Sequence, residues 1–493
     1  MSATQVTLAR RTMGVGALIG IGMSASSPQS VLNGGITTMF ANTGVQGAPL
    51  AFLVVGFVFA LISVGYVAVS RYVPHGAPFY AQLALGFSPS WGLIAAGVAL
   101  VGYNCLQISL FALIGTSAAA LFGGVWWVWA AAAWVIVLVM GQYPGAANAK
   151  IIGVLLACEI GIVIAFDVAA FANPAAGTTI TLDGFAPSNL LVAGGGASVL
   201  VFAAAAYTGQ DSLPAYAEEA RTDQDRPGRT IFLASFGGYA LLMVLYAGTA
   251  WALLTALGPA NLADALKPGN APMVILQNMW GSGLGLLGTL LLLTSVLAAQ
   301  SAFNGFVARY LFALARENVL PVRFLASVTA GRDGGAPKGG SIGQSLIAAV
   351  VLAGFVVSGA QPMQTMFVWL STIGAVCVLI LLTLSSWSAS SYFSKGHGVG
   401  EKWLVRQGMP FVGGVTGILA LFFMASNLPT MLGLPAGSNR PWLIAVLLAA
   451  TTAVAVIGGA WLKRYRPGVY DGIGRGTPDP LLVKDARFDG VQL

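Results

Sequence analysis

Long apolar stretches separated by short polar ones follow one another along the chain. A helix needs about 20 consecutive apolar residues to cross the roughly 30 Å hydrocarbon core of a bilayer. Twelve stretches have this character, so the pattern predicts an all-α integral membrane protein with twelve transmembrane helices. The predicted spans are residues 12–41, 49–73, 91–122, 125–142, 149–172, 192–217, 231–256, 283–312, 341–359, 364–394, 408–428 and 441–462.

The first predicted span contains a run that should interrupt its helix, GIGMSASSPQSV at residues 20–31. Proline in a helix interior removes a backbone hydrogen bond and clashes with the preceding turn. Ser27 suits an N-cap and Pro28 the first position of a second half-helix, whose free N–H groups and positive dipole end would form an anion site. A proline kink relieved by the neighbouring serines is the alternative, and this segment alone supports both equally.

The sixth predicted span is interrupted in a similar way by TGQDSLP at residues 208–214. Irregular backbone is not tolerated against lipid, so a break at this depth must be buried in protein or line a cavity. Two interrupted helices five spans apart are typical of an inverted repeat of five plus five helices, with the binding site between the repeats. We therefore expect discontinuous helices 1 and 6. The expected divisions are 1–172 for the first repeat, 192–394 for the second, 408–462 for the last two helices and 463–493 for a cytoplasmic tail.

Composition and charge agree with a membrane protein. Of the 493 residues, 57% are hydrophobic and only 8% are charged, against about a quarter charged in a soluble domain. If the N-terminus is cytoplasmic, all 23 lysine and arginine residues except Lys267 and Arg440 lie on the cytoplasmic side, as the positive-inside rule requires. The net charge of +7 then reflects topology, and no nucleic-acid partner is expected. This predicts a multi-pass protein of the inner (cytoplasmic) membrane with both termini in the cytoplasm.

Three acidic residues lie inside predicted spans, and of these Asp167 lies near the outer end of the fifth span, where we expect it to reach water. Deeper in a span, a carboxylate costs several kcal/mol and normally faces a cavity or exchanges protons. Glu159 is the deepest, and we expect it to couple transport to protons; a protonated packing carboxyl bonded to a nearby serine or carbonyl is the alternative. Asp211 could contact a solute ammonium, exchange a proton or cap the second half of the sixth helix, and capping is favoured.

In the third span, Tyr103, Asn104 and Gln107 share one helical face, because residues three and four apart are neighbours. They either line a cavity or bond neighbouring helices, and their clustering favours the cavity. No span carries a histidine, paired carboxylates or a cysteine and histidine set, which an enzyme or a metal site would need. We expect no enzyme activity, no metal and no cofactor.

Three cytoplasmic segments carry a resemblance to a known family. EEARTDQDRPGRTI at 218–231, ARYLFALARENVLP at 308–321 and SRYVPHGAPFYAQ at 70–82 are similar to segments of the amino acid-polyamine-organocation transporter superfamily. The resemblance covers roughly residues 8–465 and implies a bacterial amino acid permease type of transporter. It also implies that the break in the first helix receives a substrate carboxylate and that the break in the sixth helix lies beside it.

The chain departs from the family at three places that matter. Many members have a Gly-Ser-Gly or Gly-Ala-Gly run in the first break, where this chain has MSASSP at 23–28. The family's acidic position in the sixth break corresponds to Asp211. Glu159 stands where several proton-coupled members have a lysine in place of a sodium ion, so coupling through that lysine does not transfer.

These observations predict a secondary active transporter that imports a small amino acid or amine by proton symport and alternating access. The bilayer, the solute and the proton are its expected partners. A zwitterion would place its carboxylate at the first break and its ammonium at the carbonyls that end the first half of helix six. An amino acid/amine exchanger, or a channel or non-transporting solute receptor on the same fold, is the alternative. The candidate substrate-binding residues are Ser24, Ala25, Ser26, Ser27, Tyr103, Asn104, Gln107, Ala206, Tyr207, Thr208, Gly209, Gln210 and Asp211.

Overall fold

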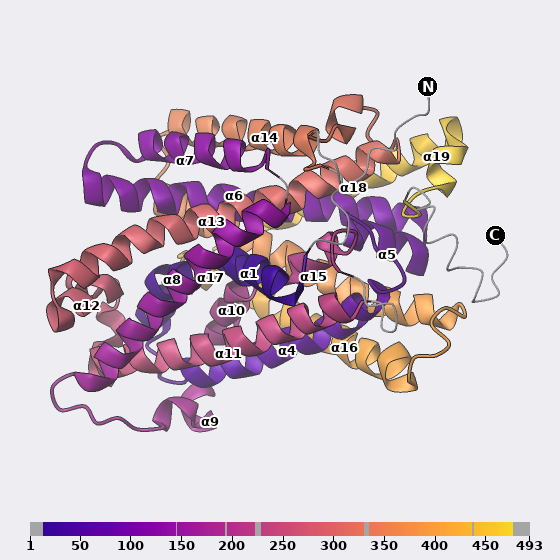
Figure 1. Ribbon diagram of the computed structural model, residues 1–493. Coiled ribbons are helices and arrows are strands. Elements are labelled where there is room, and N and C mark those ends of the chain that lie inside the picture. Colours follow the sequence, from indigo (N-terminus) through magenta and orange to yellow (C-terminus); the bar gives the residue numbers. More distant parts are fainter. Residues whose placement is uncertain are drawn as a thin grey trace.

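Helices running roughly along one axis make up the protein (Figure 1). The computed structural model describes residues 13–143, 145–192, 195–221, 228–329, 335–435 and 438–476. Within these ranges, nine helices are long and apolar enough to cross a membrane. They are α4 (Ala48–Val69), α6 (Pro89–Phe122), α8 (Gly145–Ala172), α11 (Arg229–Leu257), α13 (Ser282–Arg316), α14 (Lys338–Ser358), α15 (Val368–Ser394) with the π-helical η7 (Pro362–Phe367), α16 (Met409–Ser426) with η8 (Leu404–Gly408), and α18 (Trp442–Tyr465).

The all-α membrane fold predicted from the apolar pattern is thereby confirmed, and these nine helices match nine of the predicted spans. The other three predicted spans correspond to α7 (Trp126–Met140), which has only 15 residues, and to the two interrupted segments. The total of twelve crossings stays a prediction.

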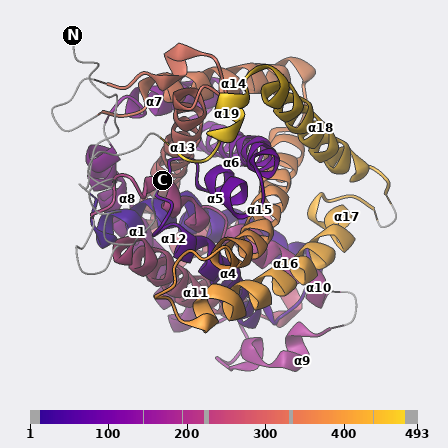
Figure 2. The same ribbon diagram turned by 90° about the vertical axis from the view of Figure 1, so that its right-hand side faces the viewer.

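The rim of the bundle is apolar, as a surface against lipid must be. Viewed along the bundle, α16 and α18 lie at its edge (Figure 2). On α18 the side chains of Trp442, Val446, Val454 and Ile457 are all exposed. By contrast, the polar side chains that fall within the spans are mostly buried against other helices.

The first predicted span is interrupted at Ser27. Helix α1 (Val15–Ser26) ends there, and Ser27 has a φ of +47°, in the left-handed region that a side chain disfavours. Three segments follow: α2 (Pro28–Ser30), the π-helical η1 (Val31–Ile36) and α3 (Thr37–Thr43). The residues that join them keep right-handed helical angles, so residues 28–43 form one continuous rod. We call it the outer rod.

The sixth predicted span is interrupted after α10 (Gly196–Ala206). Gly209 has a φ of +109°, which only glycine adopts readily, and a 3₁₀ helix, η3 (Gln210–Tyr216), follows. The predicted second half-helix is therefore not α-helical, because Pro214 lies within it and lacks an N–H group.

Short elements mark the two ends of the bundle. At one end lie α5 (Pro78–Gly86) and α19 (Pro467–Asp471), and toward the other lie α9 (Pro187–Leu190) and α12 (Pro272–Trp280) (Figure 1). We call the first end the terminal face and the second the distal face. At the terminal face the start of α1 is joined to the chain after η3, because the Met13 N–H donates to Glu219 O (3.1 Å) and the Arg221 N–H to Met13 O (2.9 Å).

Candidate functional site

A cavity of about 690 Å³ lies where the two interrupted helices meet. Its size falls within the range of small-molecule sites, roughly 300–1,000 Å³. Its walls are formed by the outer rod, the end of α10, the middle of α6 and the π-helical segment η7. Its polar lining includes Ser26, Ser27, Ser30, Asn33, Ser109, Thr208 and Thr372, and its aromatic lining Phe52, Phe202, Phe303, Phe367 and Trp369.

The cavity reaches the distal face. Leu266, which precedes α12, and Arg440, which precedes α18, both line it. Among the described lining residues, Arg440 is the single charged side chain, and none is acidic. The cavity therefore offers hydroxyl, amide and aromatic groups to a solute, with one exposed cation near its mouth.

The two interruptions touch each other at the base of this cavity. The Ser26 hydroxyl donates to the Thr208 carbonyl oxygen (3.2 Å) and lies 3.3 Å from that of Gly22. Gly209 packs so closely on the first break that a β-carbon there would lie 2.8 Å from the Ala25 carbonyl carbon. The breaks are thus brought together by a hydrogen bond and by a contact that only glycine permits.

Ser27 does not act as the predicted N-cap, since its side chain makes no capping bond. Its hydroxyl instead shares hydrogen bonds with the hydroxyls of Ser30 (2.6 Å) and Ser295 (2.8 Å). The left-handed φ of Ser27 places it outside the extended conformation that an N-cap normally has.

Glu159 supplies the missing cap. Its Oε1 accepts a hydrogen bond of 2.7 Å from the backbone N–H of Gln29, in the first turn of the outer rod. The side chain is 1% exposed, and its Oε2 has no partner among the described residues. Glu159 does not itself line the cavity but lies behind Ser27 and Ser30, which do. The bond to a backbone N–H was not among the partners expected from the sequence.

Asp211 holds the second break in place. Its Oδ1 accepts from the Gly209 N–H (2.8 Å), and its Oδ2 accepts from the Tyr103 hydroxyl. Gln210 extends between α1 and α11, where its Nε2 donates to the carbonyl oxygens of Ala234 and Ser235, both at 3.1 Å. The Tyr207 hydroxyl donates to Phe52 O (2.6 Å). These contacts explain the polar residues in an otherwise apolar span.

Asn104 and Gln107 belong to an interhelical hydrogen-bond network. Gln344 of α14 donates from Nε2 to Gln107 Oε1 and to Asn104 Oδ1 (3.3 Å), and Gln107 donates to Gln300 O of α13 (3.3 Å). Such polar contacts join helices in a membrane. The structure thus favours the packing alternative for this face of the third span.

The predicted binding residues divide into two groups. Those that line the cavity are Ala25, Ser26, Ser27, Ala206 and Thr208. Those that lie behind the lining are Ser24, Tyr103, Asn104, Gln107, Tyr207, Gly209, Gln210 and Asp211. The η7 wall, with Gln364 and Thr365, was not predicted. A signal existed, because the QPMQT run at 361–365 places polar residues where an apolar span begins.

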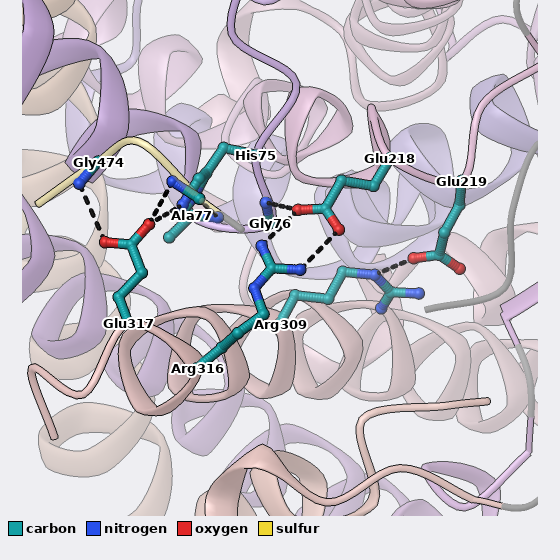
Figure 3. Close-up of polar contacts among 10 residues, drawn as sticks. His75, Gly76, Ala77, Glu218, Glu219, Arg309, Arg316, Glu317 and Gly474 are labelled. Atoms are coloured by element: carbon teal, nitrogen blue, oxygen red, sulfur yellow. Dashed lines mark hydrogen bonds and ion pairs between the residues drawn. The ribbon is translucent and has the colours of Figure 1, made fainter. Parts of the chain in front are cut away.

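Charged residues gather at the opposite end of the bundle, at the terminal face (Figure 3). Arg309 Nε donates to Glu219 Oε1 at 2.6 Å, and both side chains are almost fully buried. The Arg309 guanidinium also lies 3.9 Å from the ring centre of Tyr216. Arg316 binds both oxygens of Glu218 (2.9 and 3.1 Å), and the Gly76 N–H adds a third bond to that carboxylate (3.0 Å).

Glu317 is the acceptor of the second part of this cluster (Figure 3). It accepts from His75 Nε2 (2.8 Å), the Tyr80 hydroxyl (2.5 Å) and the backbone N–H groups of Gly474 (2.9 Å) and Gly476 (2.7 Å). His75 Nδ1 accepts from the Ala77 N–H (2.9 Å), so the ring proton lies on Nε2. We call His75, Glu218, Glu219, Arg309, Arg316 and Glu317 the terminal cluster.

The hydrogen-bond partners of Glu218 and Glu317 stabilise the charged forms of these two glutamates. Burial alone would raise the pKa of Glu218, but the adjacent Arg316 guanidinium holds it below its usual range. Burial likewise opposes ionisation of Glu317, yet the hydrogen bonds from His75, Tyr80 and Gly474 lower its pKa. Both glutamates are therefore carboxylates at neutral pH.

All three segments that carried the family resemblance meet in the terminal cluster. Segment 70–82 provides His75, and segment 218–231 provides Glu218 and Glu219. Segment 308–321 provides Arg309, Arg316 and Glu317. Residues 222–227 of the second segment lie outside the described residues. From the sequence these charges indicated topology only; the structure shows that they pair and seal the terminal face.

No group of three or more histidine, cysteine, aspartate or glutamate residues suited to a metal ion occurs in the described part of the chain. This leaves the cavity and the terminal cluster as the two polar features to be explained.

Comparison with known proteins places these features in a family. A family model described as amino acid permease matches residues 12–451. No curated protein matches the chain. A structure of the manganese transporter of Eremococcus coleocola with an aromatic bis-isothiourea compound is similar at 12% identity, covering 94% of this chain and 98% of that one, with a TM-score of 0.57. A mutant of that transporter is similar at 13% identity, 92% and 97% coverage and a TM-score of 0.56. At such identities the likeness establishes the fold alone.

Proposed function

Because the chain belongs to the amino acid permease family, and is thus a membrane transporter rather than an enzyme, we propose that it imports a small amino acid or amine. The proposed mode is secondary active transport by alternating access across the inner membrane, with both termini in the cytoplasm. In that orientation the distal face is outside and the terminal face is cytoplasmic. The distribution of lysine and arginine supports it.

One observation carries this proposal: the cavity between the two helix interruptions reaches one face of the bundle while ion pairs close the other. The cavity extends to Arg440 on the distal side, and the Glu219–Arg309 pair is buried on the terminal side. Alternating access requires a central site that is open to one side at a time. The arrangement supports an outward-facing form of such a transporter.

The lining suits a zwitterion that has an apolar part. A carboxylate would lie at the start of the outer rod, beside Ser26, Ser27 and Ser30, because helix starts attract anions. An ammonium would lie near the end of α10 at Ala206 and Tyr207, where helix-terminal carbonyls collect. The aromatic wall, with Phe303 and Trp369, would receive an apolar side chain.

We propose proton symport, with Glu159 as the coupling residue, in preference to sodium coupling. Glu159 is buried at the start of the outer rod, and one of its oxygens has no described partner. A buried carboxyl that can change its protonation beside the binding site is the arrangement such coupling needs. Asp211 is engaged in holding the second break, so it is less suited to that role.

Uptake by proteoliposomes tests the proposal. Labelled amino acids should accumulate under an imposed inward proton gradient, with or without sodium. Glu159→Gln should abolish the accumulation, whereas Asp167→Asn, which removes a carboxylate from the same helix, should retain most of it. Undiminished gradient-driven uptake by Glu159→Gln would remove Glu159 from the mechanism.

Two alternatives are separated by the same preparation. An amino acid/amine exchanger should take up label only when the vesicles contain a counter-solute, and a channel or receptor should show no such stimulation. Manganese, the ion named for the structural neighbour, can be added as a competitor. We expect no competition, since no described lining side chain is an aspartate, glutamate, histidine or cysteine.

A further inference from the structure

The start of the outer rod is already occupied by a carboxylate of the protein itself. The first N–H groups of a helix lack partners within the helix and carry the positive end of its dipole. Here the Gln29 N–H donates to Glu159 Oε1 at 2.7 Å. The second oxygen, Oε2, is buried without a described partner, in a side chain that is 1% exposed.

Only one turn of backbone separates this carboxylate from the cavity. Ser27 and Ser30, on either side of Gln29, line the cavity, while Gln29 is fully buried against Glu159. The Ser27 hydroxyl bonds Ser30 and Ser295, so this turn is fixed to α13. A solute anion at the start of the rod and the Glu159 carboxylate would therefore use the same helix end from opposite sides.

We propose that Glu159 and the carboxylate of a bound amino acid compete for the start of the outer rod, so that an amino acid binds together with a proton on Glu159. An amine that lacks a carboxylate binds without that proton. This inference rests on the proposed function and adds to it the reason why transport and protonation are linked.

Among the described residues, no cation near Glu159 could hold two carboxylates at once. From α11 the hydroxyl of Tyr246 faces it, from α13 that of Ser295, and from α2 the Gln29 N–H. The first break on α1 presents the neutral Ser24 and Ser26, and Asp167 lies two turns further along α8. The Glu159 carboxylate and a solute carboxylate at the same helix end would repel each other strongly, because the surrounding medium has a low dielectric constant. A proton on one of the two relieves this repulsion.

The linkage can be measured as binding. The probes are the twenty common amino acids, and each one that binds is paired with the primary amine that lacks only its carboxylate. Dissociation constants are measured by calorimetry between pH 5.5 and 7.5. Where Glu159 is charged in the free protein, amino acid affinity should fall about tenfold per pH unit, the slope for one linked proton. The amine should show no such slope.

Calorimetry in buffers of different ionisation enthalpy counts the protons directly in the unaltered protein. We expect uptake of about one proton with the amino acid and none with the amine. Glu159→Gln should bind the amino acid with no pH slope and no proton uptake, and Asp167→Asn should keep both.

The other possible outcomes contradict either this inference alone or the proposed function as well. Equal slopes for amino acid and amine, or a slope that survives in Glu159→Gln, would overturn this inference. If amino acids bind without proton uptake but still accumulate under an inward proton gradient, this inference alone fails. If no amino acid and no amine binds, the proposed function fails and this inference with it.

Discussion

The region around the two helix interruptions and the terminal cluster treat buried polarity in opposite ways. In the terminal cluster both arginines are paired with glutamates, as Arg309 is with Glu219 at 2.6 Å, and Glu317 accepts four hydrogen bonds. Around the interruptions no ion pair is found among the described residues. There, the buried atoms without a described partner include Ser24 Oγ, Gln29 Nε2, Glu159 Oε2 and Gln210 Oε1.

This difference indicates what each region is for. Paired charges favour one arrangement strongly, because separating them leaves a buried charge without compensation. Neutral hydroxyls and an incompletely bonded carboxylate leave hydrogen-bonding capacity for a solute or a proton. The terminal cluster is therefore suited to holding one face closed, and the interrupted region to exchanging partners.

The largest expected effect comes from breaking the buried pair in the terminal cluster. Arg309→Ala leaves Glu219 buried without its cation and removes the contact with the Tyr216 ring. We expect the free energy of unfolding to fall by about 3–5 kcal/mol. Thermal unfolding of the protein in detergent measures this loss.

Two controls sharpen this result. Replacing both partners together, Arg309→Met with Glu219→Met, should recover at least half of the loss, because no buried charge remains. Ser26→Ala, which removes a neutral hydrogen bond between the interruptions, should cost only about 1 kcal/mol. A double variant as unstable as Arg309→Ala would contradict the explanation by pairing.

A smaller effect is expected from the contact between the two interruptions. Gly209→Ala places a side chain at a φ of +109° and against the backbone of Ala25. We expect a loss of about 2–3 kcal/mol, from strain of 1–3 kcal/mol with the added clash, together with weaker solute binding. Gly161→Ala is the matched control, because a β-carbon there meets nothing within 4 Å. Its stability should stay within about 1 kcal/mol of the parent, and an equal loss in both variants would argue against the contact.

The smallest expected effect is a pH-dependent one in the terminal cluster. Glu317→Gln should cost about 2 kcal/mol at pH 7, the worth of hydrogen bonds to a charged group. Since the folded-state pKa of Glu317 lies below its ordinary value, its contribution is complete above about pH 4.3. It is lost as the pH falls through the lowered pKa. Melting curves of parent and variant should therefore converge at low pH.

Glu401→Gln provides the comparison for that experiment. Glu401 pairs with Arg71 at 2.8 Å, but both side chains are partly exposed, at 18% and 27%. Solvent screens such a pair, and we expect a loss of at most about 0.5 kcal/mol. A loss as large as that of Glu317→Gln would show that burial does not set the difference.

The positions of the helices could be predicted from the sequence because lipid imposes a simple rule on them. Apolar stretches long enough to cross a bilayer gave spans whose ends agree with the observed helices to within a few residues, as for α4 and α6. Pro28, Gly209 and Pro214 lie at the two interruptions, and the constraints that they place on the backbone are local. Short helices such as α5 and α12 were not predicted, because neither spans a membrane.

The partners of the polar side chains could not be predicted, because they depend on which helices become neighbours. Asn104 and Gln107 could face a cavity or another helix from their spacing alone, and only the position of Gln344 on α14 decides the matter. Glu219 and Arg309 are 90 residues apart in the chain. The bond from Gln29 to Glu159 likewise joins two spans, and no local pattern indicates it.

The bridge between Met13 and Ala220 has a mechanical consequence. It fastens the terminal-side halves of both interrupted helices to one another through backbone alone, so no change of side chain can undo it. Gln210 adds to this connection, because its side chain packs between α1 and α11. If the terminal face opens during transport, α1 and the chain after η3 must therefore move as one rigid unit.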